Sequence, residues 1–151
     1  MSRVAAVILA GGRGERLGGV IKSELRVGGR RLLDRVHAVL ATCEPVLVAH
    51  GRLAPHLLAL PSGVEPVPDL PGEYAGPLAG FAAAIDALKR RAPTPTYLIA
   101  VAVDSPFLPP DYVARLLDSI GDADAAIASY GGQIYPTNSI WRIAALADLT
   151  D

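Results

Sequence analysis

A glycine-rich segment with three cationic side chains follows directly on the first apolar run of the chain. The apolar run, Val4 to Ala10, contains no charge, which is typical of a strand buried on both faces. The residues that follow and could bind an anion are Gly11, Gly12, Arg13, Gly14, Arg16 and Lys22. Glycine has no Cβ, so its backbone N–H groups can approach an anion closely, while arginine and lysine add mobile positive charge. This pattern favours a triphosphate-binding loop over a plain strand-to-helix turn.

Two commoner phosphate-binding motifs do not fit this segment. A P-loop has glycine directly before Lys-Ser, but Ile21 precedes Lys22 here. The dinucleotide fingerprint G-x-G-x-x-G fails because Leu17 occupies the position of its third glycine. The second expected strand also ends in Ala-His-Gly, without the carboxylate that binds a ribose. These departures argue against a nicotinamide-dependent enzyme.

The rest of the chain has the pattern of one α/β domain. Apolar runs predict strands at 4–10, 46–49, 64–67, 97–103, 125–130 and 134–141, and helical spacing predicts helices at 31–40, 53–60, 78–88, 111–120 and 142–149. Alternating strands and helices predict a three-layer, Rossmann-like fold, with a mostly parallel sheet and helices on both faces. Gly11, His50, Asp69 and Asp104 fall at or just past the carboxyl ends of strands. Ligands bind at that edge of such sheets, so we expect one nucleotide site there.

Composition narrows the class of partner. The chain has 151 residues, 51% of them hydrophobic, and a formal net charge of −1, which suits a single domain over residues 1–151. This charge gives no general attraction to nucleic acid or to an anionic membrane. Cys43 is the single cysteine, and no apolar run reaches the length of a membrane span. We therefore expect a cytoplasmic protein without a disulfide framework, in which Cys43 is a packed residue rather than a nucleophile.

Several stretches together resemble the nucleotidyltransferase superfamily that activates sugars and cofactors. The opening signature is LAGGRGERLGGVIKSEL followed by VGGRRLLDRV; the later stretches are PVPDLPGEYAGPLAG, AVAVDSPFLPPD and YPTNSIWR. Within the superfamily the chain is most similar to the molybdenum cofactor guanylyltransferases, from Val4 to about Trp141. The resemblance implies transfer of GMP from GTP to molybdopterin with release of pyrophosphate. It also implies Mg²⁺ as cofactor, GTP and molybdopterin as substrates, and transient contact with molybdenum cofactor biosynthesis proteins or a molybdoenzyme.

The resemblance also implies a set of site residues. Asp104 matches the metal-binding aspartate and Lys22 the nucleotide-binding lysine, with Arg16 as a further catalytic cation. The other implied nucleotide contacts are Leu9, Ala10, Gly11, Gly12, His50, Asp69, Gly76, Pro77 and Leu78. The attacking phosphate is already anionic at neutral pH, so this chemistry requires charge cancellation and no general base. The residues alone leave two alternatives open: an Asx turn at Asp104 and a solvated surface charge at Lys22.

The chain departs from the family pattern at four places. Ile21 stands where an aspartate is usual, His50 where an asparagine is usual, and Tyr135-Pro136 where relatives often have His-Pro. We also expect the chain to lack the family's C-terminal, asparagine-containing segment, because it stops at Asp151. Two other functions therefore stay open. One is a nucleotidyltransferase that uses CTP or another nucleotide, or a sugar-phosphate acceptor; the other is a non-catalytic GTP-binding module.

Overall fold

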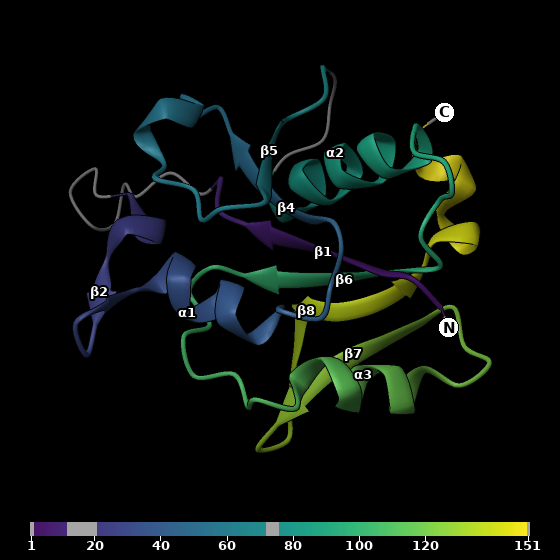
Figure 1. Ribbon diagram of the computed structural model, residues 1–151. Helices are drawn as coiled ribbons and strands as arrows, with labels where there is room; N and C mark the ends of the chain where they lie inside the picture. Colours follow the sequence, from purple (N-terminus) through teal and green to yellow (C-terminus); the bar gives the residue numbers. More distant parts are fainter. Residues whose placement is uncertain (1, 12–20, 72–75, 151) are drawn as a thin grey trace.

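The computed structural model describes residues 2–11, 21–71 and 76–150 (Figure 1). Its strands are β1 (Val4–Leu9), β2 (Arg26–Val27), β3 (Arg30–Arg31), β4 (Val46–Gly51), β5 (Val64–Pro68), β6 (Tyr97–Ala102), β7 (Ala125–Tyr130) and β8 (Gln133–Arg142). Its α-helices are α1 (Leu32–Val39), α2 (Pro77–Lys89) and α3 (Tyr112–Ile120). Short 3-10 helices occur at η2 (Lys22–Glu24), η3 (Pro55–Leu57) and η4 (Ile143–Thr150).

The main sheet has six strands in the order β5-β4-β1-β6-β8-β7. Strands β5, β4, β1 and β6 pair in parallel, whereas β8 runs antiparallel to both β6 and β7. The two longest unbroken apolar runs in the sequence, at β1 and β6, lie side by side in the middle of the sheet. This arrangement confirms the predicted mostly parallel α/β sheet.

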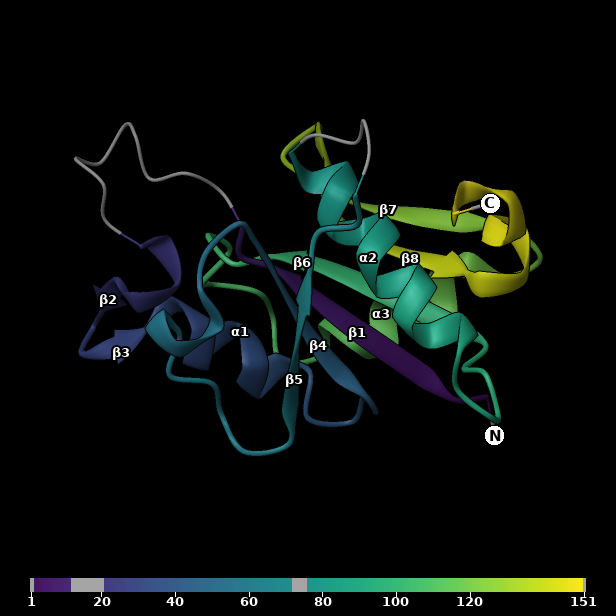
Figure 2. The same ribbon diagram turned by 90° about the horizontal axis from the view of Figure 1, so that it is seen from above.

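Helices cover both faces of the sheet, which makes three layers (Figures 1 and 2). Alternate side chains of β1 point to opposite faces, as the period of a strand requires. Ala6 and Ile8 pack with residues of α1 and α3, whereas Ala5 and Val7 pack with residues of α2. Each fully buried Ile, Leu or Val side chain stabilises the fold by about 1.5–3 kcal/mol, so both cores contribute substantially.

Two of the predicted helices are wrong in extent. Residues 53–60 contain only the 3-10 turn η3, after which Leu58 is extended, with a ψ of 113°. Pro61 then follows, and the residue before a proline is disfavoured in the helical region. The segment predicted to begin a helix at Arg142 is still strand there, since Arg142 pairs with Tyr97. The following residues, 143–150, form 3-10 helix with a kink at Leu146.

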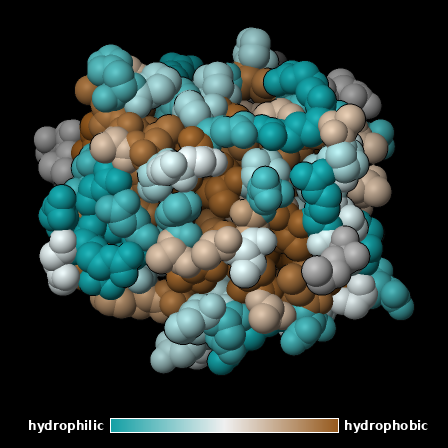
Figure 3. All heavy atoms as spheres, viewed as in Figure 1, coloured by the Kyte–Doolittle hydropathy of each residue, from teal (hydrophilic) through white to brown (hydrophobic). Residues whose placement is uncertain are grey.

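Hydrophilic side chains surround a central region of hydrophobic atoms on the face drawn in Figure 3. Phe107 and Tyr130 are the most exposed large hydrophobic side chains among the described residues, at 77% and 83%. No helix within the described part of the chain is both long enough and apolar enough to cross a membrane.

Candidate functional site

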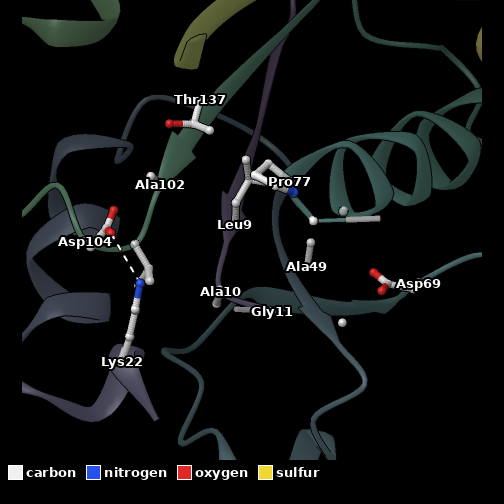
Figure 4. Close-up of a pocket in the computed structure, with 14 residues that line it drawn as sticks. Leu9, Ala10, Gly11, Lys22, Ala49, Asp69, Pro77, Ala102, Asp104 and Thr137 are labelled. Carbon is white, nitrogen blue, oxygen red and sulfur yellow. Dashed lines mark ion pairs between the residues drawn. The ribbon is translucent and has the colours of Figure 1, made fainter. Parts of the chain in front are cut away.

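A pocket of about 270 Å³ opens at the carboxyl ends of the parallel strands. It is lined by Leu9, Ala10, Gly11, Lys22, Ala49, Gly51, Asp69, Gly76, Pro77, Gly80, Ala102, Val103, Asp104 and Thr137 (Figure 4). These residues come from seven separate segments of the chain. The pocket therefore lies where the strand order predicts a ligand site in a sheet of this kind.

Two glycines allow the ends of β1 and β4 to approach each other closely. A Cβ on Gly11 would lie 2.8 Å from the backbone nitrogen of Gly51. A Cβ on Gly51 would in turn lie 3.0 Å from the carbonyl oxygen of Gly11, and Gly51 has a φ of +59°. Neither position accepts a side chain without backbone movement, so the floor of the pocket is bare main chain at this point.

The amino end of α2 forms another wall of the pocket. Gly76 is the N-cap of this 13-residue helix, with φ 61° and ψ −145°, and Pro77 is the first helical residue. No side chain of the described residues caps the helix. Pro77 has no N–H, and the Ala79 N–H donates to the carbonyl oxygen of Gly76 at 3.1 Å, so the Leu78 N–H is the first-turn donor left for a ligand in the described part of the chain. A helix N-terminus attracts negative charge. Gly80, one turn further, lets α2 pack directly on Ala49 and Leu9.

Lys22 and Asp104 face each other across one side of the pocket. The Lys22 Nζ lies 3.6 Å from the Asp104 Oδ2, with side-chain exposures of 36% and 57% (Figure 4). Lys22 begins η2, whose last residue, Glu24, accepts hydrogen bonds from the Arg31 guanidinium at 3.0 and 3.1 Å. Arg31 also donates to both carboxylate oxygens of Asp34 at 2.8 Å and holds the pKa of that carboxyl below its usual range. This network fixes the segment that presents the lysine.

Asp69 supplies a second carboxylate, on the opposite side of the pocket from Lys22 and Asp104 (Figure 4). Within the described residues, no group of three or more His, Cys, Asp or Glu side chains could hold a metal ion. A metal at Asp104 would therefore take its remaining ligands from phosphate oxygens and water. Mg²⁺ is commonly bound in this way, by one carboxylate and substrate phosphates, so the exposed Asp104 fits it.

Residues 6–151 match the MobA-like NTP transferase domain. The chain belongs to this family. A molybdenum cofactor guanylyltransferase from Bradyrhizobium sp. (strain ORS 278) is 41% identical over 154 residues, covering 97% of this chain and 69% of that protein.

Two solved structures share the fold of this MobA-like domain. Molybdopterin-guanine dinucleotide biosynthesis protein A from Archaeoglobus fulgidus has a TM-score of 0.65 at 24% identity, covering 93% of this chain and 68% of that chain. Rv0371C from Mycobacterium tuberculosis, in complex with manganese, has a TM-score of 0.70 at 20% identity. The match covers 99% of this chain and 75% of that chain. The predicted nucleotidyltransferase fold is thereby confirmed.

The pocket of the MobA-like domain brings together most of the predicted contacts that the structure describes. They are Leu9, Ala10, Gly11, Lys22, Asp69, Gly76, Pro77 and Asp104. Gly12 and Arg16 lie outside the described residues. The roles of all these residues in binding or catalysis stay predictions.

His50 and Leu78 do not line the pocket. His50 is only 4% exposed, and its Nδ1 lies 2.7 Å from the carbonyl oxygen of Leu53. The ring is thus engaged in the turn that follows β4. Leu78 is 47% exposed on the first turn of α2. The geometry therefore lends no support to a nucleotide contact from either side chain.

Sequence reasoning missed five of the lining residues: Ala49, Gly51, Ala102, Val103 and Thr137. Gly51 directly follows His50, the residue selected on family position, and the close approach that requires glycine arises only when β4 lies beside β1. Thr137 is part of the YPTNSIWR stretch, but periodicity does not reveal that β8 brings it to the pocket. The local signal that could have pointed to Gly51 is its place directly after a buried strand.

Proposed function

We propose that this protein transfers GMP from GTP to molybdopterin, forming the guanine dinucleotide of the cofactor and pyrophosphate. The observation that carries the proposal is the facing pair Lys22 and Asp104, set between a bare glycine floor and an uncapped helix N-terminus. The identity to a molybdenum cofactor guanylyltransferase over nearly the whole chain supports the choice of substrates.

The reaction joins an anionic phosphate oxygen to the α-phosphorus of GTP and breaks the bond from that phosphorus to the bridging oxygen of pyrophosphate. The incoming phosphate already carries a negative charge, so no side chain has to remove a proton. The chain's own task is to hold several negative charges close together. Lys22 supplies one positive charge at the pocket wall, and the N-terminus of α2 supplies partial positive charge from its N–H groups.

Asp104 is the residue that would hold Mg²⁺, and the bound ion would neutralise charge on the phosphoryl oxygens as a Lewis acid. Its carboxylate is exposed to the pocket, beside the ammonium group that would meet the same phosphates. Asp69 lies on the opposite side of the pocket from Asp104 (Figure 4), which favours a ribose or base contact for it over a share in the metal site.

Gly76, Pro77 and Gly80 favour guanine as the base. These pocket-lining residues have no long side chains, which permits close approach of a planar ring at the start of α2. The same surface does not by itself reject cytosine, so a cytidylyl enzyme is the alternative that the experiment must separate. We also propose transient contact with other proteins: molybdenum cofactor biosynthesis proteins would supply the cofactor, and a molybdoenzyme would receive it.

The test has two measurements on the purified protein. In the first, GTP with Mg²⁺ is expected to raise the melting temperature more than ATP, CTP or UTP with Mg²⁺. In the second, pyrophosphate is expected only when GTP, Mg²⁺ and molybdopterin are all present. Equal melting shifts with all four nucleotides would remove the guanylyl assignment. Binding of GTP without pyrophosphate release would instead indicate the non-catalytic module.

A further inference from the structure

Strand β8 is irregular where it passes the pocket. Its pairing with β7 runs from Trp141 to Ser139 opposite Ala125 to Ile127, then resumes with Tyr135 opposite Ala128. Residues 136–138 therefore have no partner in β7 and form a bulge. The pairing of β8 with β6 also stops, at Ser139 opposite Ala100. Bulges beside active sites commonly redirect a side chain, and this one contains Asn138.

Asn138 lies in that bulge and is 6% exposed. Both ends of its side-chain amide form hydrogen bonds with the segment that follows β6. Its Oδ1 accepts a hydrogen bond from the backbone N–H of Ala102 at 2.9 Å. Its Nδ2 donates to the Oγ of Ser105 at 3.0 Å. The orientation of the amide is unambiguous, because a backbone N–H can only donate and must face the oxygen.

Ala102 and Ser105 are the two ends of the turn that carries Asp104. The turn is closed by a hydrogen bond from the N–H of Ser105 to the carbonyl oxygen of Ala102 at 3.1 Å. The N–H of Val103, inside the turn, donates to the carbonyl oxygen of Leu9 at 3.2 Å. The main chain on both sides of Asp104 is thus tied to β1 from one direction and to Asn138 from the other.

The Asp104 side chain has little else to fix it. It is 57% exposed, and the single ion pair recorded for it among the described residues is the one with Lys22, at 3.6 Å. Its place in the pocket consequently depends on the backbone of the turn. A loosened turn would let the carboxylate move away from the lysine and from any phosphate-bound cation.

We propose that Asn138 is a positioning residue, which holds the Ala102–Ser105 turn so that Asp104 meets the metal-nucleotide complex. The inference rests on the proposed function, since it assumes that Asp104 is the carboxylate that faces the metal. Asn138 does not line the pocket. Its removal should therefore weaken the contribution of the metal to nucleotide binding while leaving metal-free nucleotide binding intact.

The main test variant is Asn138→Ala, and Ser105→Ala removes only the hydroxyl at the other end of the bridge. Tyr112→Phe is the matched control. The Tyr112 hydroxyl is also buried and donates to strand β6, at the carbonyl oxygen of Ala100, 3.3 Å away, but it does not touch the turn. Each variant loses side-chain hydrogen bonding to β6 or the turn after it: two bonds in Asn138→Ala and one each in Ser105→Ala and Tyr112→Phe. We expect only the first two variants to release Asp104.

Binding of GTP is measured by titration calorimetry, once with Mn²⁺ and once with EDTA, so no turnover is needed. In wild type and Tyr112→Phe we expect the same gain in affinity from the metal. In Asn138→Ala we expect the gain in GTP affinity from the metal to be smaller by about 10-fold or more. In Ser105→Ala we expect this gain to be reduced as well. Hydrogen exchange of the Ala102 amide should be faster in Asn138→Ala and unchanged in Tyr112→Phe.

The outcomes separate the inference from the proposed function. Wild type that does not bind GTP with metal overturns both. Wild type that gains affinity from the metal, with Asn138→Ala gaining as much, overturns the positioning role alone. Loss of metal-free binding in Asn138→Ala, or an equal loss in Tyr112→Phe, would show general loosening and would also overturn it. Should Asn138→Ala fail to fold, Ser105→Ala decides the question by the same measurement.

Discussion

Replacement of Gly80 by alanine sets local helix propensity against tertiary packing. Gly80 is the fourth residue of α2, and alanine in a helix is more favourable than glycine by about 1 kcal/mol. The helix alone therefore predicts stabilisation. In the fold, however, the new Cβ would lie 2.9 Å from the Cβ of Ala49 and 3.1 Å from the Cδ2 of Leu9.

The contact with Ala49 decides the sign of the change. Leu9 can turn the end of its side chain away, but the Ala49 Cβ is fixed to the backbone of β4 and is 2% exposed. Helix and strand must therefore move apart. Overpacking of this kind costs about 1–3 kcal/mol, more than the gain of about 1 kcal/mol from propensity. We expect a net loss of about 1 kcal/mol in the free energy of unfolding, which lowers Tm by about 2–4 °C for a domain of this size.

Urea unfolding followed by tryptophan fluorescence is the assay. Trp141 is the single tryptophan, and its ring lies 5.4 Å from that of Phe81, the residue after Gly80 in α2. Ser119→Ala, at an exposed position of α3, is the propensity control and should be neutral or slightly stabilising. Adding Ala49→Gly to Gly80→Ala removes the contacted Cβ and should give a favourable coupling of about 1 kcal/mol. A stabilised Gly80→Ala protein, or a coupling near zero, would refute the packing argument.

The remaining predictions concern single side chains. Lys22→Ala should weaken GTP affinity about 10-fold or more, or about 1.4 kcal/mol, by calorimetry. Its unfolding free energy should change by less than about 1 kcal/mol, because the ion pair with Asp104 is exposed; unchanged affinity would make Lys22 a plain surface charge. Asp104→Asn should fold normally and lose about 100-fold or more in GMP transfer at saturating GTP with Mg²⁺, and a mutant that keeps over a tenth of the wild-type rate contradicts its metal role. Burial raises the pKa of the Cys43 thiol to about 11, so Ellman's reagent at pH 8 should react with this thiol only after unfolding. The free energy of unfolding should fall as the pH rises from about 9 through 11, since the thiol of the unfolded chain loses its proton at a lower pH than the buried thiol.

The sequence by itself determined the elements and the edge at which they meet. The uncharged runs at β1 and β6 are local signals of burial on both faces, and the parallel order places Gly11, Asp69 and Asp104 at one edge. Those residues could be found because strand ends and glycine-rich turns are features of neighbouring residues. The same locality explains the error at residues 53–60, where apolar spacing suggested a helix but the chain is extended from Leu58, after one 3-10 turn.

Only the tertiary structure decided how distant segments complete the site. Gly51 and Gly80 are required because β1, β4 and α2 approach within contact distance, which no local pattern records. His50 could be placed at the right strand end, but the structure turns its ring toward the Leu53 carbonyl. Asn138 reaches the Asp104 turn only because β8 folds back antiparallel beside β6 and breaks its register there. Contacts of this kind depend on the packing of residues far apart in the chain, so the sequence pattern along any one element cannot specify them.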